Sequence, residues 1–173
     1  KSYNVPKTCF NNLVNNVVCD RLGNIYATTY LELLYFNPAQ KRLEVIGDFL
    51  NNHPNPDACN TGKNCLVKDE KSNALWITTS AGLYYYDLKE KTLHGFNDQK
   101  NKPLFSSRRC RALTHFKDGQ LMFADNTNKE IIFFDPVQKE ITKKIALASF
   151  EPNAYVATIL LDNQDKLWLC SFN

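Results

Sequence analysis

The sequence has few of the residue patterns that enzymes require. It contains three histidines, His53, His94 and His115, and none of them lies in a recognisable nucleophile or zinc motif. The six glycines stand mostly at turns and form no phosphate-binding loop. His94 and His115 fall in strand-like segments, where we expect hydrogen-bonded structural histidines. The sequence therefore predicts no catalytic activity for this chain and no cofactor.

Long apolar runs and a strong charge of one sign are also missing. No stretch of about 18 apolar residues is present, so no membrane-spanning helix is expected. The net charge of +3 is too small and too dispersed for a nucleic-acid-binding surface, and we expect no contact with nucleic acid. The first residues, Lys1-Ser2-Tyr3-Asn4, do not resemble a signal peptide.

The six cysteines form no recognisable framework. No Cys-x-x-Cys pair occurs, and no metal site is expected. Cys19, Cys110 and Cys170 fall in or beside predicted strands, where a free thiol packs as a small apolar group. Cys59 and Cys65 flank a loop and could form a disulfide in an oxidising compartment.

What the sequence does contain is one short motif repeated four times. Its bulky central residue is Tyr26, Trp76, Met122 or Trp168, and the intervals between these residues are 50, 46 and 46. The copies are Gly23–Thr29, Asn73–Thr79, Gly119–Asp125 and Asp165–Ser171. A period of this length is typical of propeller blades, solenoid turns or array units.

Each repeat predicts four short antiparallel strands. Runs of about five residues, rich in aromatic and β-branched types, are separated by turns rich in Asp, Asn, Gly and Pro. No segment has a sustained apolar period of 3.6 residues, which excludes a helical solenoid. Four-stranded units repeated along a chain are the blades of a β-propeller, so we predict this all-β fold. The alternative is an all-β sandwich whose strands resemble one another by chance.

The repeat predicts about three and a half blades within residues 1–173. We place them at 13–49, 64–96, 109–147 and, truncated, 155–173. A propeller needs roughly four to eight blades to close, so we expect a partial β-propeller, a fragment of an incomplete ring. An open half-ring would expose unpaired strand edges, and we expect it to associate with another copy or to behave poorly alone.

Regularly placed polar and aromatic residues have structural explanations. Asp20, Asp69, Asp118 and Asp162 occupy the first turn of each repeat, where an Asp side chain commonly accepts bonds from its own backbone. We therefore interpret them as turn-formers and not as a carboxylate cluster. The bulky residue at the centre of each motif is expected to pack between neighbouring blades.

One face of the predicted ring is the candidate binding face, because blade-to-blade connectors and the turns between second and third strands open there. The candidate ligand-binding residues are Tyr30, Arg108, Arg109, Arg111, Asp125 and Asn126, with Glu32, His53 and Asp57 as polar neighbours. The segment 106–111 carries three guanidinium groups that could hold carboxylates or sulfates by paired donors. The alternative is that one or two of these arginines face solvent or pair with acidic residues.

The motif resembles the two-component regulator propeller repeat. Asp20–Thr28 and Ala74–Asp87 follow its pattern of Asp, a turn Gly, Leu-Trp-Ile-Gly-Thr, Gly-Leu and an aromatic–Asp pair. Thr78 stands where the family usually has Gly, and Met122 replaces Trp in the third repeat. The turn at 125–130 is also longer than the family pattern. The resemblance covers nearly the whole chain.

The resemblance implies a sensor function. Its members look like hybrid two-component sensors of gut bacteria, with two seven-bladed propellers and a small sandwich domain outside the inner membrane. A membrane helix, a histidine kinase, a receiver and a DNA-binding domain follow. The usual stimulus is an oligosaccharide, and the response is transcription of genes for glycan degradation.

By this resemblance the chain would be part of a periplasmic sensing region within an inner-membrane protein. Its partners would be an oligosaccharide, the remaining propeller blades and a second copy of the parent sensor in a homodimer. Two other interpretations remain open: a propeller scaffold that binds proteins, and part of a propeller-type polysaccharide lyase, which would need His, Tyr and Arg at the centre of the ring.

Overall fold

The computed structural model describes residues 13–49, 61–95, 109–147 and 155–172, and within them the chain forms successive antiparallel sheets. The first sheet contains β1 (Asn16–Cys19), β2 (Ile25–Thr28), β3 (Glu32–Asn37) and β4 (Arg42–Asp48). The second contains β5 (Thr61–Asp69), β6 (Ala74–Thr79), β7 (Gly82–Asp87) and β8 (Thr92–Gly95). The third contains β9 (Cys110–His115), β10 (Leu121–Asp125), β11 (Glu130–Asp135) and β12 (Glu140–Ala146), and the fourth β13 (Tyr155–Leu161) and β14 (Leu167–Phe172).

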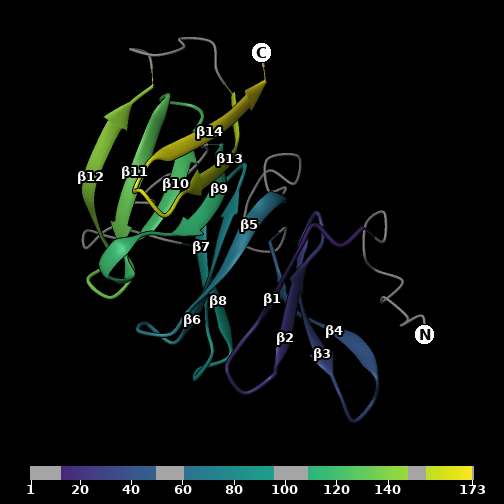
Figure 1. The fold of residues 1–173 in the computed structure, drawn as a ribbon. Helices are drawn as coiled ribbons and strands as arrows, with labels where there is room; N and C mark the ends of the chain where they lie inside the picture. Colours follow the sequence, from purple (N-terminus) through teal and green to yellow (C-terminus); the bar gives the residue numbers. More distant parts are fainter. Residues whose placement is uncertain (1–12, 50–60, 96–108, 148–154, 173) are drawn as a thin grey trace.

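The sheets are arranged as the blades of a propeller. In each four-stranded sheet the spatial order of the strands is their order in the chain. The first strand of each sheet contacts the first strand of the next: β1 meets β5, β5 meets β9, and β9 meets β13. Figure 1 shows the third, second and first sheets fanned out from left to right, with β12 and β4 at opposite sides and the fourth sheet above. This confirms the predicted partial β-propeller and excludes two facing layers; the described sheets do not close into a ring.

The turns between third and fourth strands are built alike in three sheets. In each, a side-chain oxygen accepts hydrogen bonds from the backbone amides two and three residues later, at 2.8–3.2 Å. The accepting residues are Asn37, Asp87 and Asp135. A lysine with positive φ completes each turn: Lys41, Lys91 and Lys139. The repeated turn chemistry thus produces a repeated turn geometry.

Three of the four regularly placed aspartates are turn-formers, as predicted. The Asp20 and Asp162 carboxylates each accept amide hydrogen bonds from residues two and four positions later. Asp69 accepts one from the Ser72 amide at 2.6 Å. Asp118 differs, because it lies in a short 3₁₀ turn (Lys117–Gly119) and makes the turn through its own left-handed backbone, with φ 58°.

The core lies between the sheets. Trp76 is fully buried, and its ring meets Phe134 of the third sheet edge-on, with centroids 5.1 Å apart. Met122 packs in the same way with Val156 and Ile159 of the fourth sheet. Tyr26, also buried, packs against residues of the second sheet. These contacts confirm the predicted role of the central motif residue in the first three repeats.

Trp168 departs from this pattern. Its side chain is 59% exposed, and its indole N–H donates to Asp162 Oδ2 at 2.8 Å. The prediction that it packs between blades is therefore wrong for the described chain. The physical reason is that no sheet covers this side of the fourth sheet in the described residues, where Leu160 is also 62% exposed.

The predicted packing role of the cysteines holds only in part. Cys110 is fully buried in a strand, as expected. Cys19 and Cys170 lie in strands but are exposed, because each points away from the neighbouring sheet. Cys65 is buried and carries a free thiol 3.4 Å from Thr28 Oγ1. Cys59 lies outside the described residues.

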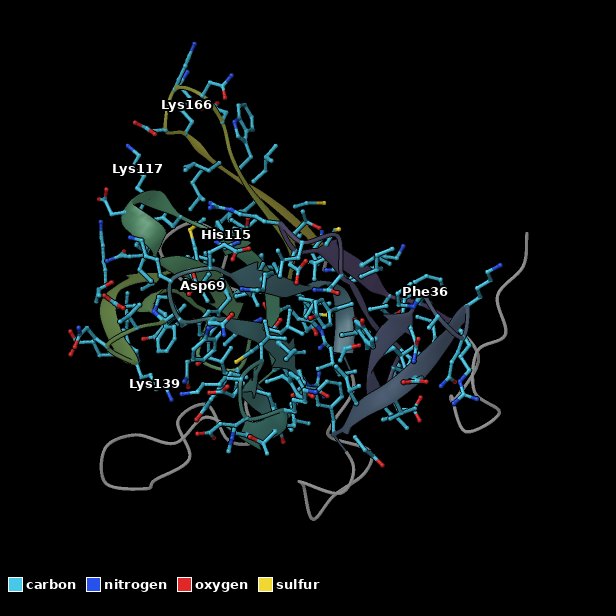
Figure 2. The ribbon with its side chains drawn as sticks, turned by 90° about the horizontal axis from the view of Figure 1, so that it is seen from below. Phe36, Asp69, His115, Lys117, Lys139 and Lys166 are labelled. Carbon is cyan, nitrogen blue, oxygen red and sulfur yellow. The ribbon has the colours of Figure 1, made fainter. Side chains whose placement is uncertain are left out.

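The first sheet has an uncovered face as well. Val14, Val17 and Ile25 are exposed there and line an apolar groove of about 240 Å³ together with Phe36 and Leu43. Figure 2 shows Phe36 on the opposite side of the molecule from Lys117 and Lys139 of the third sheet. As expected, one strand edge is open: β14 ends a two-stranded sheet and has no further partner strand among the described residues. The open propeller arc also exposes a sheet face, because neighbouring blades pack face to face.

Among the residues that the structure describes, no helix is long and apolar enough to cross a membrane.

Candidate ligand-binding site

The first strands of the second, third and fourth sheets share an irregularity near their beginnings. The pairing register of β5 shifts between Thr61 and Leu66, and β13 shifts between Val156 and Thr158. In β9 the shift coincides with Ala112, a buried residue whose φ is 58°. Bulges bend a strand and change the direction of the side chains beside them, and they are frequent next to binding sites.

The residues beside these bulges line one pocket of about 510 Å³, which we call the inner-strand pocket. Its lining residues are Gly62, Lys63, Arg109, Arg111, Tyr155 and Ala157. Three sheets therefore contribute two residues each, and three of the six carry a positive charge. None of the described residues that line this pocket is acidic.

Arg111 lies directly against the backbone of β5. A Cβ atom added at Gly62 would come within 2.9 Å of Arg111 Cδ and 3.0 Å of its Nε. Glycine at position 62 is thus what permits the guanidinium group to cross the strand, since any larger residue would have to displace it. Arg111 is half-buried, whereas Arg109 and Lys63 are exposed.

Asn126 positions the strands around this pocket. Its side-chain amide donates to the Val156 carbonyl at 2.9 Å, and its Oδ1 accepts from the Val156 amide at 2.8 Å. Its own backbone amide donates to the Arg109 carbonyl at 2.9 Å. Asn64 adds a bond from its side-chain amide to Thr158 Oγ1 at 3.1 Å. The two buried hydrogen bonds of the Asn126 side chain fix the relative position of the third and fourth sheets.

The structure brings together only part of the predicted residue set. Arg109 and Arg111 line the pocket, while Asn126 is buried behind it. The buried Asp125 carboxylate accepts from the Thr127 and Asn128 amides, both at 3.1 Å, and so shapes the turn.

Tyr30 and Glu32 lie elsewhere, in the first sheet. Tyr30 is 39% exposed, and its carbonyl accepts from the Thr61 amide at 2.9 Å. Glu32 is buried, and its amide donates to Thr29 Oγ1 at 3.1 Å. Arg108, His53 and Asp57 lie outside the described residues.

Among the lining residues with charged or polar side chains, Lys63 and Tyr155 were not candidates from the sequence. Both stand at the beginning of a first strand, as Arg109 and Arg111 do in the third repeat. Aligning the repeats from the start of the first strand, and not only from the central motif, would have found them. β5 begins at Thr61, earlier than the predicted blade start at residue 64, and this hid the correspondence.

The charge of Arg111 also acts on the thiol of Cys65. Burial raises the pKa of the Cys65 thiol, and the charge of the nearby Arg111 acts in the opposite direction but does not outweigh it. Cys65 therefore remains a buried thiol and not a reactive thiolate.

A second cavity, of about 370 Å³, opens at the opposite ends of the strands. It lies between the first and second sheets, and we call it the tyrosine cavity after Tyr26, Tyr35 and Tyr86 in its lining. Burial raises the pKa of Tyr26 to about 12 and also raises the pKa of Tyr86. The phenols of Tyr26 and Tyr86 are therefore neutral in the physiological range and contribute ring surface and hydroxyl groups.

The described histidines have structural contacts. His115 Nε2 lies 3.1 Å from the Lys68 carbonyl, which joins the third sheet to the second, although the His115 side chain is exposed (labelled in Figure 2). His94 stacks on Tyr85 with ring centroids 4.9 Å apart. Neither lines the inner-strand pocket. The described residues contain no group of His, Cys, Asp and Glu that could hold a metal ion.

Solved structures of similar fold include sensor domains and lyases. No family model and no curated protein matches the chain. The extracellular domain assigned to one hybrid two-component system of B. thetaiotaomicron matches 96% of the chain, with a TM-score of 0.67 and 18% identity. A second such domain from this organism matches 93%, with a TM-score of 0.66 and 20% identity. A catalytically inactive virginiamycin B lyase from Staphylococcus aureus, solved with quinupristin, matches 98%, with a TM-score of 0.72 and 16% identity.

These similarities show the fold. At 16–20% identity they do not show the activity. The chain spans about a fifth of the length of the two sensor domains and about half of the lyase.

Proposed function

We propose that this chain is part of the ligand-sensing region of a hybrid two-component sensor. The region would lie in the periplasm, within an inner-membrane protein, and would detect an oligosaccharide that induces genes for glycan use. The observation that carries this proposal is the structural likeness of nearly the whole chain to two extracellular domains of such systems. The motif residues that resemble the two-component regulator repeat support it independently.

The uncovered faces support a place within a longer propeller. The apolar groove on the first sheet has the exposed aliphatic residues Val14, Val17 and Ile25, and the fourth sheet exposes Leu160 and Trp168. Apolar surface of this kind is normally covered by a neighbouring blade, because blades pack face to face. In the proposed parent protein, the remaining blades would occupy both faces, and two parent chains would form a homodimer.

The inner-strand pocket is the proposed ligand site. It lies at the ends of the first strands, where the propeller architecture places side chains from several blades around one space. Arg109 and Arg111 supply hydrogen-bond donors, and Tyr155 supplies an aromatic ring with a polar end, which suits the mixed polar and apolar surface of a sugar. A ligand bound there would shift the sensor toward one conformation only by binding that conformation more tightly.

A lyase is the second candidate, because a lyase shares the fold over 98% of the chain. The inner-strand pocket contains Arg and Tyr, but neither His94 nor His115 lines it. We therefore propose that this chain binds its ligand without chemical turnover. Incubation with a panel of polysaccharides, followed by analysis for unsaturated products, separates the two functions.

The proposal is tested in the full-length parent protein. Its reading frame should encode a membrane helix and a histidine kinase after the propeller, and an oligosaccharide that raises its melting temperature should also induce transcription of glycan-degradation genes. A reading frame without a kinase, or ligand binding with no transcriptional response, would contradict a sensor function and favour a protein-binding scaffold.

A further inference from the structure

The inner-strand pocket has a chemical selectivity that goes beyond the proposed sensor function. We propose that it recognises the acidic groups, carboxylates or sulfates, of a charged glycan, with the guanidinium groups of Arg109 and Arg111 as the principal contacts. This inference rests on the proposed function for the glycan part of the ligand. The anionic part rests on the pocket itself.

The described lining of the pocket is positively charged. Lys63 from the second sheet and Arg109 and Arg111 from the third line one space, and no acidic side chain is among its described lining residues. An anion bound in this space would be attracted by all three charges, most strongly where water is partly excluded. The whole chain has a net charge of only +3, so this grouping is a local feature and not the consequence of a basic protein.

The side chain of Arg111 is confined before any ligand binds. Arg111 is half-buried and lies across Gly62, where even a Cβ atom would come within 2.9 Å of its side chain. A guanidinium group held in this way loses little conformational entropy when it binds a carboxylate or sulfate through two parallel donors. The backbone on both sides is fixed as well, since the Arg109 amide donates to Thr127 Oγ1 at 2.9 Å and its carbonyl accepts from the Asn126 amide.

Part of the pocket lining is uncharged. Tyr155 and Ala157, both half-buried, line the same pocket from the fourth sheet. A small residue and an aromatic ring leave room for a sugar ring next to the charged groups, and the volume of about 510 Å³ suits an oligosaccharide segment better than an isolated ion. The combination favours an acidic sugar over free sulfate or phosphate.

The test is calorimetric titration of the full-length parent protein with matched probes. The probes are an oligogalacturonide, its carboxyl-reduced neutral counterpart, a sulfated galactose oligosaccharide and inorganic sulfate. We expect at least one acidic oligosaccharide to bind about tenfold or more tightly than the neutral one and than sulfate, because charge-assisted paired hydrogen bonds are lost in the neutral probe. Raising the salt concentration should weaken this binding.

The variants separate the pocket from general charge effects. Arg109→Gln and Arg111→Gln should each weaken the acidic probe about tenfold or more, and Arg111→Lys should lie between Arg111→Gln and the unchanged chain, since it keeps the charge and loses the paired donors. Gly62→Ala should weaken binding by displacing Arg111. Lys166→Gln, which removes the same charge in the turn between β13 and β14, should have no effect.

The outcomes distinguish this inference from the sensor proposal. Equal binding of acidic and neutral oligosaccharides, binding of inorganic sulfate alone, or no binding of any probe would overturn the inference. If Arg111→Gln fails to fold, the salt dependence of the unchanged protein still tests the inference. Binding of the acidic probe that does not weaken with salt would overturn it. Selective acidic binding together with no transcriptional response in the full-length protein would support the inference and contradict the sensor proposal.

Discussion

At the scale of single residues, Thr78 reveals a local conflict. Its hydroxyl oxygen is the only buried side-chain N or O atom in the described residues without a hydrogen-bond partner. Thr78 pairs with Leu83 on one side, but on the other side it faces the irregular segment of β5 between Thr61 and Leu66. The two-component regulator repeat, which the motif resembles, usually has Gly at this position, so the departure from its pattern coincides with the unsatisfied hydroxyl group.

Thr78→Val should therefore stabilise the chain by about 1 kcal/mol, because the isosteric methyl group removes a buried unsatisfied hydroxyl. Urea unfolding at neutral pH measures the change. Thr79→Val is the matched control: the Thr79 hydroxyl accepts from the Ala81 amide and donates to the Gly82 carbonyl, so its loss should be destabilising. Destabilisation by Thr78→Val would show that the hydroxyl has a partner in solution.

The turn carboxylates make stability depend on pH. The amide hydrogen bond from Glu90, with a second one from Lys89, holds the pKa of Asp87 below its usual 3.8. The indole N–H of Trp168 lowers the pKa of Asp162 in the same way. A carboxyl whose pKa is lowered by folding stabilises the folded state fully above the unfolded pKa, and this contribution disappears as the pH falls through the folded pKa.

Asp87→Asn should flatten the loss of stability that accompanies acidification below about pH 4, because an amide accepts the same turn bonds without titrating. Asn37 makes this turn with an amide in the first sheet, at 3.0 and 3.2 Å, which shows that the turn survives the change. The measurement is the unfolding free energy between pH 2 and 7. Parallel curves for the variant and the unchanged chain would contradict the assignment.

At the scale of strands and sheets, the same motif residue has different surroundings in different repeats. Trp76 Nε1 donates to Ser72 Oγ at 3.1 Å, and the Trp168 indole donates to Asp162, so both side chains keep a polar contact in the first turn of their repeat. Trp76 is covered by the third sheet, whereas Trp168 is 59% exposed. Burial between sheets, and not the motif itself, therefore determines how much each tryptophan contributes to the stability of the fold.

Trp76→Ala should destabilise the chain by about 3–5 kcal/mol, since it leaves a large cavity between the second and third sheets. Trp168→Ala should change the stability by less than about 1 kcal/mol, because a mostly exposed side chain loses little packing. Chemical denaturation of the two variants under one condition makes the comparison. Similar losses would mean that Trp168 is buried in solution by a surface that the described chain does not include.

At the same scale, the sequence predicted those features of the fold that depend on short segments and recur in each repeat. The four-stranded units, three of the aspartate turns and the packing of Tyr26, Trp76 and Met122 all follow from residue periodicity and turn chemistry. The site was predicted only in part, because it depends on where bulges in β5, β9 and β13 direct side chains from three sheets. Arg109 and Arg111 were found from their own charge. Lys63 and Tyr155 could be recognised as pocket residues only from the structure, in which the first strands lie side by side.

At the scale of the whole molecule, the two ends of the strands differ in chemistry. The pocket at the start of β5, β9 and β13 is cationic, whereas the tyrosine cavity at the opposite ends is aromatic and carries both Glu44 and Lys91. Because the sheets converge on their first strands, residues of three sheets meet at the first of these places, whereas the tyrosine cavity is lined by two sheets (Figure 1). We therefore expect the ligand to bind in the inner-strand pocket, where the sheets converge.

Mapping of ligand contacts by NMR tests this assignment most directly. An acidic oligosaccharide that binds is titrated into the ¹⁵N-labelled chain, and the shifted backbone amides are identified. We expect the shifted amides to cluster at Gly62, Lys63, Arg111 and Tyr155, and we expect no shifted amides around the tyrosine cavity. Shifts confined to Tyr26, Tyr35 and Tyr86, or spread evenly over the surface, would contradict this expectation.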